Sequence, residues 1–202
     1  MTTISPPIPL PISSVKWRII EPAQVNRSAW TGRRKVIGLP GAARWTATVD
    51  MQPVVGEANM LRWRGWITSL RGSINAFPLR AVERQQTMAT NPYVGTGANA
   101  NTTMPLTDLP VSTTVLKAGQ FMTVSLPTGD KRLVCLTADL VSNSLGNATA
   151  AFAPELGEAP FEGALVEIQY PYALMALNSD PAGWDVARGQ LYTFTLDCEE
   201  AL

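Results

Sequence analysis

Hydrophobic and polar residues alternate with a period of two along several short segments of the chain. In RWTATVDM, residues 44–51, every second side chain is apolar and the intervening ones are polar. The segment LYTFTLDC, residues 191–198, has the same alternation. Such a period is typical of a β-strand with one buried face, so both segments are predicted strands whose apolar faces point into a core.

A helical period separates the first of these strands from the next part of the chain. Five apolar residues fall on one stripe of a helix: Met60, Trp63, Trp66, Ile67 and Leu70. Pro53 precedes this segment and Gly72 follows it, as expected at the start and the end of a helix. The pattern predicts a helix over residues 54–71 whose tryptophan face packs on the sheet formed by residues 44–51. We interpret the tryptophans as core residues rather than as platforms for a ligand.

The second half of the chain predicts a separate β module. Short apolar segments alternate with turns centred on glycine, at residues 120–126, 132–141, 148–154 and 164–171. Regular spacing of this kind is typical of a small barrel or sandwich. Residues 85–112 precede these strands and are rich in Asn, Thr, Gly and Pro, which predicts a long irregular loop.

The final strand, within residues 180–202, has no obvious partner in the β module. Its return to the first sheet would make the first domain discontinuous. The predicted fold class is therefore mainly β (α+β), a β-sandwich with one packed helix and an inserted small β-barrel, OB-like or sandwich module. The predicted domain boundaries are an extended arm at 1–14, a sandwich domain at 15–90 plus 180–202, a linker loop at 91–112, and the inserted module at 113–179.

The same patterns predict which side chains form the core. The apolar faces of the strands and the helix give these candidates: Trp45, Val49, Met60, Trp63, Trp66, Ile67, Leu70, Val134, Leu136, Tyr192, Phe194 and Leu196. The chain has 202 residues and 46% hydrophobic content, which suffices for one large core or two small ones.

Charge is distributed unevenly although the net charge is zero. Residues 1–90 carry 12 Lys and Arg against 4 Asp and Glu, a balance of +8, and residues 91–202 carry 4 against 12, a balance of −8. The two oppositely charged halves can attract each other within one chain, or they can meet between subunits arranged head to tail. Alternatively, both sets of charges are simply solvated.

The sequence offers no recognisable catalytic or metal-binding constellation. It has no histidine, the commonest general base and metal ligand. No phosphate-binding glycine loop and no G-x-S-x-G motif occurs. Cys135 and Cys198 are interpreted as buried thiols, and Glu155, Glu158 and Glu162 as a solvated loop. We therefore predict a protein that is not an enzyme, with no catalytic residue, metal or cofactor.

The N-terminal segment MTTISPPIPLPISS is predicted to be an extended arm. It has no basic residue, and its apolar positions are interrupted by prolines, so it does not have the pattern of a signal peptide. The chain has no apolar run of 18 residues, so no transmembrane helix and no membrane insertion are predicted.

Two alternatives to a structural role are open at this stage. A carbohydrate-binding protein would present the aromatic residues Tyr93, Phe161, Tyr170 and Tyr172 to a receptor glycan. A nucleic-acid-binding protein would use the arginine- and tryptophan-rich segment 27–71, with phosphate contacts from Arg27, Arg33, Arg34, Lys35 and Arg44. Arginine beside tryptophan is also enriched in protein–protein interfaces.

The order of these features resembles the minor tail and distal tail proteins of long-tailed bacteriophages. The strand around Trp17 is followed by RSAWTG, then RWTATVDMQP, then LRWRGWITSLRGSINAFPLR, and YTFTLDCEEAL closes the chain. The segment from AGQFMTVSLPTGD to GALVEIQYPYALMAL is similar to the oligosaccharide-binding-like or sandwich insertion of some tail-tip proteins. The resemblance spans nearly the whole chain and rests on patterns of Trp, Gly and Pro.

The resemblance implies a structural virion protein of the tail or baseplate, assembled in the host cytoplasm and lacking catalytic residues. It would form a homo-oligomeric ring, commonly of six copies, that joins the tail tube to hub, tip or fibre proteins, without sequence-specific nucleic-acid binding. The candidates for interface residues come from this sequence: Pro6, Pro7, Pro9, Pro11, Arg33, Arg34, Lys35, Arg62, Arg64, Arg71 and Tyr93. The arm would reach over a neighbouring subunit and the loop 85–112 would fill a gap between subunits or rings.

Overall fold

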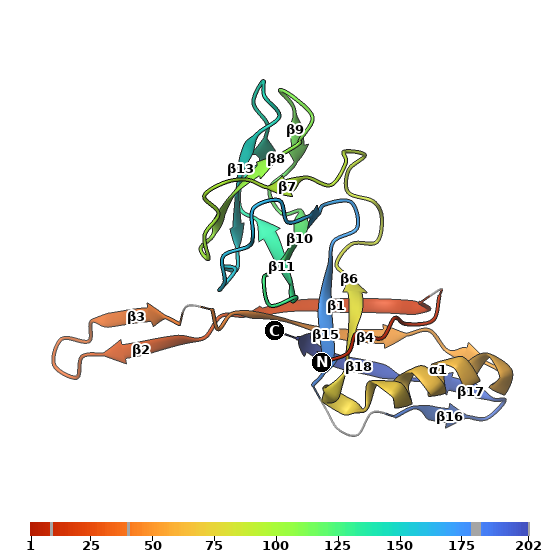
Figure 1. The fold of residues 1–202 in the computed structure, drawn as a ribbon. Helices are drawn as coiled ribbons and strands as arrows, with labels where there is room; N and C mark the ends of the chain where they lie inside the picture. The colour runs from red at the N-terminus through yellow and green to blue at the C-terminus, as the bar shows by residue number, and fades with distance from the viewer. Residues whose placement is uncertain (9, 40, 179–182, 202) are drawn as a thin grey trace. The chain divides into compact units, whose positions relative to one another are not determined.

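A computed structural model describes residues 1–8, 10–39, 41–178 and 183–201. Strands dominate the described residues, and the predicted mainly β fold is confirmed. The chain divides into two compact units (Figure 1). Unit 1 comprises Met1–Arg18, Trp45–Leu79 and Ala173–Leu202, and unit 2 comprises Ile19–Arg44 and Arg80–Tyr172.

Unit 1 is built on a five-stranded sheet. The strand order is β1–β4–β18–β15–β6. The strands are β1 (Ile12–Ile20), β4 (Arg44–Met51), β18 (Thr195–Glu200), β15 (Tyr172–Leu177) and β6 (Ala76–Arg80). In the antiparallel pair of β4 and β18, Val49 lies opposite Leu196, and both side chains are buried. The last strand of the chain therefore completes the sheet begun near its first residues.

A short three-stranded sheet continues the β4–β18 pair. It contains β5 (Val54–Val55), β17 (Leu191–Thr193) and β16 (Asp185–Ala187), in the order β16–β17–β5. The Met51 amide donates to the Phe194 carbonyl at the junction, at 3.3 Å. Because β5 follows β4 and β17 precedes β18, one long antiparallel ribbon runs through both sheets.

Helix α1 (Glu57–Leu70) belongs to unit 1, and its tryptophan face packs on other residues of that unit. The Trp63 ring lies 5.8 Å from that of Phe194, and the Trp66 ring lies 5.2 Å from that of Phe77 in β6. The predicted start at residue 54 is wrong, because Val54 and Val55 pair with β17 as β5. The helix begins only after Gly56, whose φ of +83° turns the chain out of that strand.

The opposite face of the unit 1 sheet is polar. The Asp50 carboxylate accepts hydrogen bonds from Ser14 and Thr195 hydroxyls at 2.8 and 3.2 Å, and the Lys16 ammonium lies 3.7 Å from it. The Thr48 hydroxyl donates to Asp197 at 2.8 Å. Alternation along β4 and β18 thus separates an apolar face from a hydrogen-bonded polar one.

Unit 2 contains a closed antiparallel barrel. Its six strands follow the order β14–β10–β11–β13–β8–β7. They are β14 (Val166–Glu167), β10 (Phe121–Ser125), β11 (Lys131–Leu136), β13 (Ala148–Ala153), β8 (Thr103–Thr107) and β7 (Tyr93–Val94). The first and last strands meet, because the Val94 amide donates to Ala164 and the Val166 amide donates to Pro92, at 2.9 and 3.0 Å. Closure removes the exposed sheet edges.

The barrel has its own apolar interior. Val124, Val134, Phe152 and Ile168 are among its buried residues. A small sheet of β9 (Thr114–Leu116) and β12 (Leu140–Val141) adds Leu116 and Leu140 to the same core.

The predicted linker loop at 91–112 is wrong, as is its longer form at 85–112. Residues 93–94 and 103–107 form β7 and β8 of the barrel. Met104 and Leu106 are buried on β8, but Pro105 between them disguises the alternation. Proline has no N–H, and this lack matters only at strand positions whose amide would donate a hydrogen bond to a neighbouring strand.

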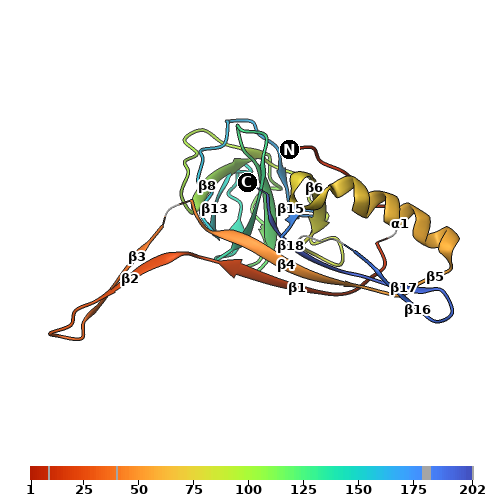
Figure 2. The same ribbon diagram turned by 90° about the horizontal axis from the view of Figure 1, so that it is seen from below.

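The domain boundary predicted at residues 15–90 also differs from the structure. Ile19–Arg44 and the residues from Arg80 onward belong to unit 2. Residues 19–44 contain a hairpin of β2 (Ala23–Arg27) and β3 (Arg34–Gly38), which Figure 2 shows as a two-stranded ribbon. The alternation of apolar and polar residues does not show where the chain passes from one unit to the other, so this boundary could not be predicted from it.

The N-terminal residues are not a free arm. Thr3 forms a parallel bridge with Ala76, and the Ile4 amide donates to the Ala76 carbonyl at 2.7 Å. The Ala76 amide in turn donates to Thr2 at 3.0 Å. Residues 12–14 already belong to β1. The described part of the predicted arm is therefore bound to unit 1 of its own chain.

All the core candidates are buried. The most exposed of them, Trp45, is 8% exposed, and its ring makes an edge contact with Trp17 at 6.3 Å. Trp63 is 1% exposed. These indole rings are thus occupied in packing the interior of unit 1.

Candidate subunit interface

The β2–β3 hairpin has a regular ladder and a compact turn. Five residue pairs run from Ala23 opposite Gly38 to Arg27 opposite Arg34. In the turn, the Ser28 amide donates to the Arg33 carbonyl at 2.9 Å. The Ser28 hydroxyl accepts from the Thr31 amide at 3.2 Å, and Gly32 supplies a positive φ of +64°. These hydrogen bonds and the positive φ of Gly32 define the turn of the hairpin.

Every residue of the hairpin is exposed, including its large apolar side chains. Trp30 at the tip is 98% exposed. Val25 and Val36 lie directly opposite each other and are each about half exposed, as is Ile37 on the other face. An isolated two-stranded hairpin is at best marginally stable in water. Exposed apolar surface on such an element is typical of a site that contacts another molecule.

The hairpin is strongly basic. Between residues 23 and 38 it carries Arg27, Arg33, Arg34 and Lys35 and no acidic residue. Arg27 and Arg34 are cross-strand partners, an arrangement that costs energy when both are charged. The hairpin therefore has both apolar surface and positive charge that its own strands leave uncompensated.

The base of the hairpin is fixed to the barrel of unit 2. The Arg132 guanidinium, which is buried on β11, donates to the Ala43 carbonyl at 2.6 Å and to the Glu155 carbonyl at 3.2 Å. The Gly41 amide donates to the Glu155 carboxylate. A buried, multiply bonded arginine holds both segments in fixed positions.

A shallow recess of about 280 Å³ lies at this base. Its apolar walls include Pro22, Leu39, Ala43 and Pro154. Glu21 and Glu155 also belong to its lining. The recess therefore combines an apolar surface with two acidic side chains.

The predicted interface residues lie in several different places. Arg33, Arg34 and Lys35 lie on the exposed hairpin, and Arg62 and Arg71 are exposed on and just after α1. Pro6, Pro7 and Pro11 are half-buried, and Pro9 lies outside the described residues. The proline and helix residues thus belong to unit 1, and the hairpin residues belong to unit 2.

Arg64 is a packing residue rather than an exposed interface group. Its guanidinium lies 3.2 Å from the Glu57 carboxylate and over the rings of Tyr192 and Trp184, at 5.0 and 5.4 Å. Both rings belong to unit 1, as does α1. Arg64 thus contacts side chains of its own unit, and its role at a subunit interface stays a prediction.

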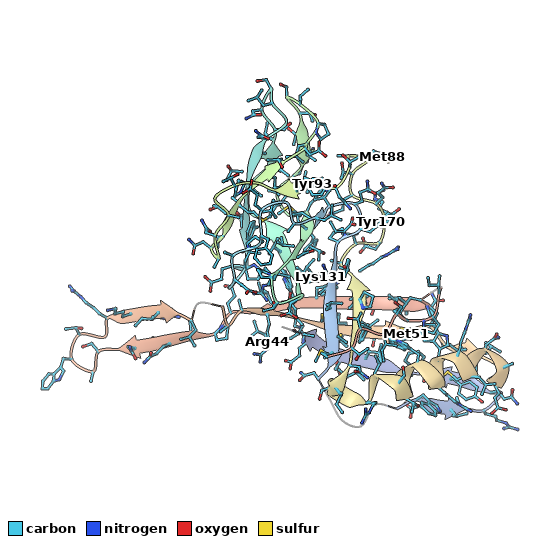
Figure 3. All side chains as sticks on the ribbon, in the orientation of Figure 1. Arg44, Met51, Met88, Tyr93, Lys131 and Tyr170 are labelled. Atoms are coloured by element: carbon cyan, nitrogen blue, oxygen red, sulfur yellow. The ribbon has the colours of Figure 1, made fainter. Side chains whose placement is uncertain are left out.

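The barrel presents a second group of exposed aromatic side chains. Tyr93 pairs with Leu165 at the barrel closure, and both are partly exposed. Phe161 is 67% exposed, and the Arg80 guanidinium lies 4.7 Å above the Tyr170 ring. Figure 3 labels Tyr93 and Tyr170. Tyr172 is only partly exposed, and burial raises its pKa.

Trp30 is an interface candidate that was not among the residues predicted from the sequence. The signal was available, because Trp30 lies between Ser28 and Gly32 in a turn and outside any apolar period. A large apolar residue at a turn tip has no strand or helix face by which to be buried. By contrast, the recess could not be predicted, because its walls come from residues 21–43 and 102–155.

Metal sites and membrane-spanning helices each have structural requirements to compare with the described residues. No group of three His, Cys, Asp or Glu side chains could hold a metal ion there. In the same part of the chain, no helix has the length and hydropathy needed to cross a membrane. Comparison with known proteins gives no match, either to a protein-family model or to a curated sequence.

Proposed function

We propose that this protein is a structural subunit of a phage tail. It forms a ring at the distal end of the tail tube and connects the tube to hub, tip or fibre proteins. The proposal combines the resemblance in the order of sequence features with one structural observation, the exposed basic β2–β3 hairpin that carries Trp30. On this proposal the partners are other copies of the chain and the neighbouring tail proteins.

The hairpin supports an assembly role because its exposed apolar area and its paired arginines are energetically unfavourable in an isolated monomer. Val25, Val36 and Trp30 leave apolar area in water, and Arg27 opposes Arg34. Contact with another subunit would bury this apolar area and would neutralise the charges of the two arginines. The acidic excess of residues 91–202 supplies the opposite charge on a second copy. Trp and Arg are also the residues that contribute most to protein–protein binding.

A nucleic-acid-binding role is the second candidate, and the same hairpin favours it. An exposed tryptophan beside three arginines is suited to stacking on a base with phosphate contacts around it. The valine pair and Ile37 argue for a protein partner, because phosphate and sugar groups do not desolvate aliphatic side chains. Salt-sensitive retention on DNA, lost in an Arg33→Ala/Arg34→Ala variant, would favour this second candidate.

The direct test is to locate the protein in particles. Gold-labelled antibodies against the chain should bind at the distal end of the tail in electron micrographs of the phage that encodes it. Light scattering of the purified protein should then give a mass several times the 21.8 kDa of one chain. Particles that lack the protein, or that carry the label only on the capsid, would contradict the proposal.

A further inference from the structure

The tip and the base of the β2–β3 hairpin are complementary to each other. The tip offers a fully exposed indole, Trp30, flanked by arginines. The base offers an apolar recess lined by Pro22, Leu39 and Pro154, with Glu21 and Glu155 beside them. The recess volume of about 280 Å³ has room for one large side chain.

Trp30 cannot reach the recess of its own chain. The strands between them are in a regular antiparallel ladder from Ala23–Gly38 to Arg27–Arg34. Four residue steps at about 3.3 Å each place the last pair about 13 Å from the first, and the turn carries Trp30 further out. Trp30 can therefore bind in a recess of this kind only on another copy of the chain.

We propose that Trp30 of one copy binds in the recess of the next copy, between Pro22, Leu39 and Pro154. The arginines at positions 27, 33 and 34 then approach the carboxylates of Glu21 and Glu155 on that next copy. The tip carries arginines and the recess lining includes two glutamates, so these side chains are opposite in charge. This inference deepens the proposed function and rests on it, because it names the contact that would hold the ring together.

The contact is heterologous, since each copy provides one tip and one different surface, the recess. Heterologous contacts repeat from subunit to subunit and produce a closed ring when the rotation between copies closes. A single type of contact then suffices to build the ring.

Photo-crosslinking tests where Trp30 binds. A variant with p-benzoylphenylalanine at position 30 is prepared with ordinary and ¹⁵N-labelled protein mixed at high concentration, so that links between copies are recognised by mass. We expect links from position 30 to peptides containing Pro22, Leu39 or Pro154 of the other copy. The same probe at Leu145, an exposed loop residue, is the control and should give no such link. Absence of links, or links elsewhere, would overturn the inference.

Two complementary variants test the direction of the contact. Trp30→Ala removes the tip and keeps the recess, and Leu39→Arg places a charge in the recess and keeps the tip. Each alone should weaken self-association by at least about 30-fold, the loss typical of a hot-spot tryptophan. Mixed, they should form a dimer that does not grow, because only one productive contact remains.

The controls separate this inference from the proposed function. Leu145→Ala, at a side chain that is also highly exposed, should leave association unchanged. Unchanged circular dichroism and melting temperature would show that the two variants fold. Tail-tip labelling with links outside the recess would overturn only the inference, whereas recess links without tail labelling would overturn only the proposed function.

Discussion

Arg27 and Arg34 lie directly opposite each other as the last cross-strand pair before the turn of the β2–β3 hairpin. Like charges in this relationship destabilise a hairpin by a few tenths of a kcal/mol up to about 1 kcal/mol. The local sequence specifies the turn well, yet the charge pattern opposes the strands that the turn joins. This conflict between local structure and charge is what a contact with an acidic partner would relieve.

Arg34→Glu should therefore make the hairpin more stable in the isolated chain. The new pair with Arg27 replaces a repulsion with an attraction worth roughly 0.2–1 kcal/mol. Amide hydrogen exchange in Ala23–Arg27 should slow by a factor of up to about 5. Lys35→Glu is the matched control, because its cross-strand partner is the neutral Asn26. Equal slowing in both variants would contradict the pairwise explanation.

Trp63→Ala should strongly destabilise unit 1. The side chain is 1% exposed and contacts the rings of Trp66 and Phe194. Loss of a buried tryptophan typically costs about 3–5 kcal/mol of unfolding free energy. Urea denaturation measures this cost, and Leu61→Ala on the exposed side of α1 should cost less than about 0.5 kcal/mol. A small effect at Trp63 would mean that the helix does not pack as described.

Gly146→Ala should destabilise unit 2 more than Gly129→Ala. Both glycines have positive φ values, +73° and +95°, so both substitutions incur backbone strain of about 1 kcal/mol. Only at Gly146 would the added Cβ lie 2.6 Å from a backbone atom, the Leu109 carbonyl oxygen. That overlap should add about 1–3 kcal/mol, measured by urea denaturation. Equal losses would show that the Leu109 segment moves freely.

Asp50 should titrate below its ordinary value in the folded protein. The hydrogen bond from Ser14 is the largest cause of the lowered pKa, ahead of those from Thr195 and the charge of Lys16. Because the folded pKa is lowered, the stabilisation is present above the ordinary value of 3.8 and is lost as pH falls through the folded value. Carboxyl NMR titration measures this, and Ser14→Ala should raise the pKa, whereas Ser13→Ala should not.

Cys198 should be inert to alkylation while the protein is folded. Burial, with a smaller contribution from Asp197, raises the pKa of its thiol from 9.0 to about 12. Very little thiolate therefore exists near pH 8, and iodoacetamide should react at the rate of unfolding. The half-buried Cys135, with a pKa also raised by burial, is the internal comparison. Because the folded pKa is raised, ionisation of the unfolded thiol should destabilise the fold as pH rises above 9.0. Fast labelling of Cys198 at neutral pH would contradict its burial.

The period of the sequence predicted individual elements well where one face is buried. Residues 44–51 form β4 with alternate side chains buried, and the apolar stripe from Met60 to Leu70 lies on α1. Prediction failed at residues 103–107, because Pro105 obscures the alternation of Met104 and Leu106. The helix start was placed too early, because a strand as short as Val54–Val55 has no period of its own.

By itself, the sequence determined the mainly β class, the buried tryptophan face of the helix and the unequal distribution of charge. These follow from local alternation and composition, which depend on neighbouring residues. Only the tertiary structure decided that residues 19–44 belong with the barrel, that the barrel closes between Tyr93 and Leu165, and that Arg64 is used internally while Trp30 is exposed. Those outcomes depend on which distant segments meet, and the free energy of such contacts comes from surfaces that no local pattern describes.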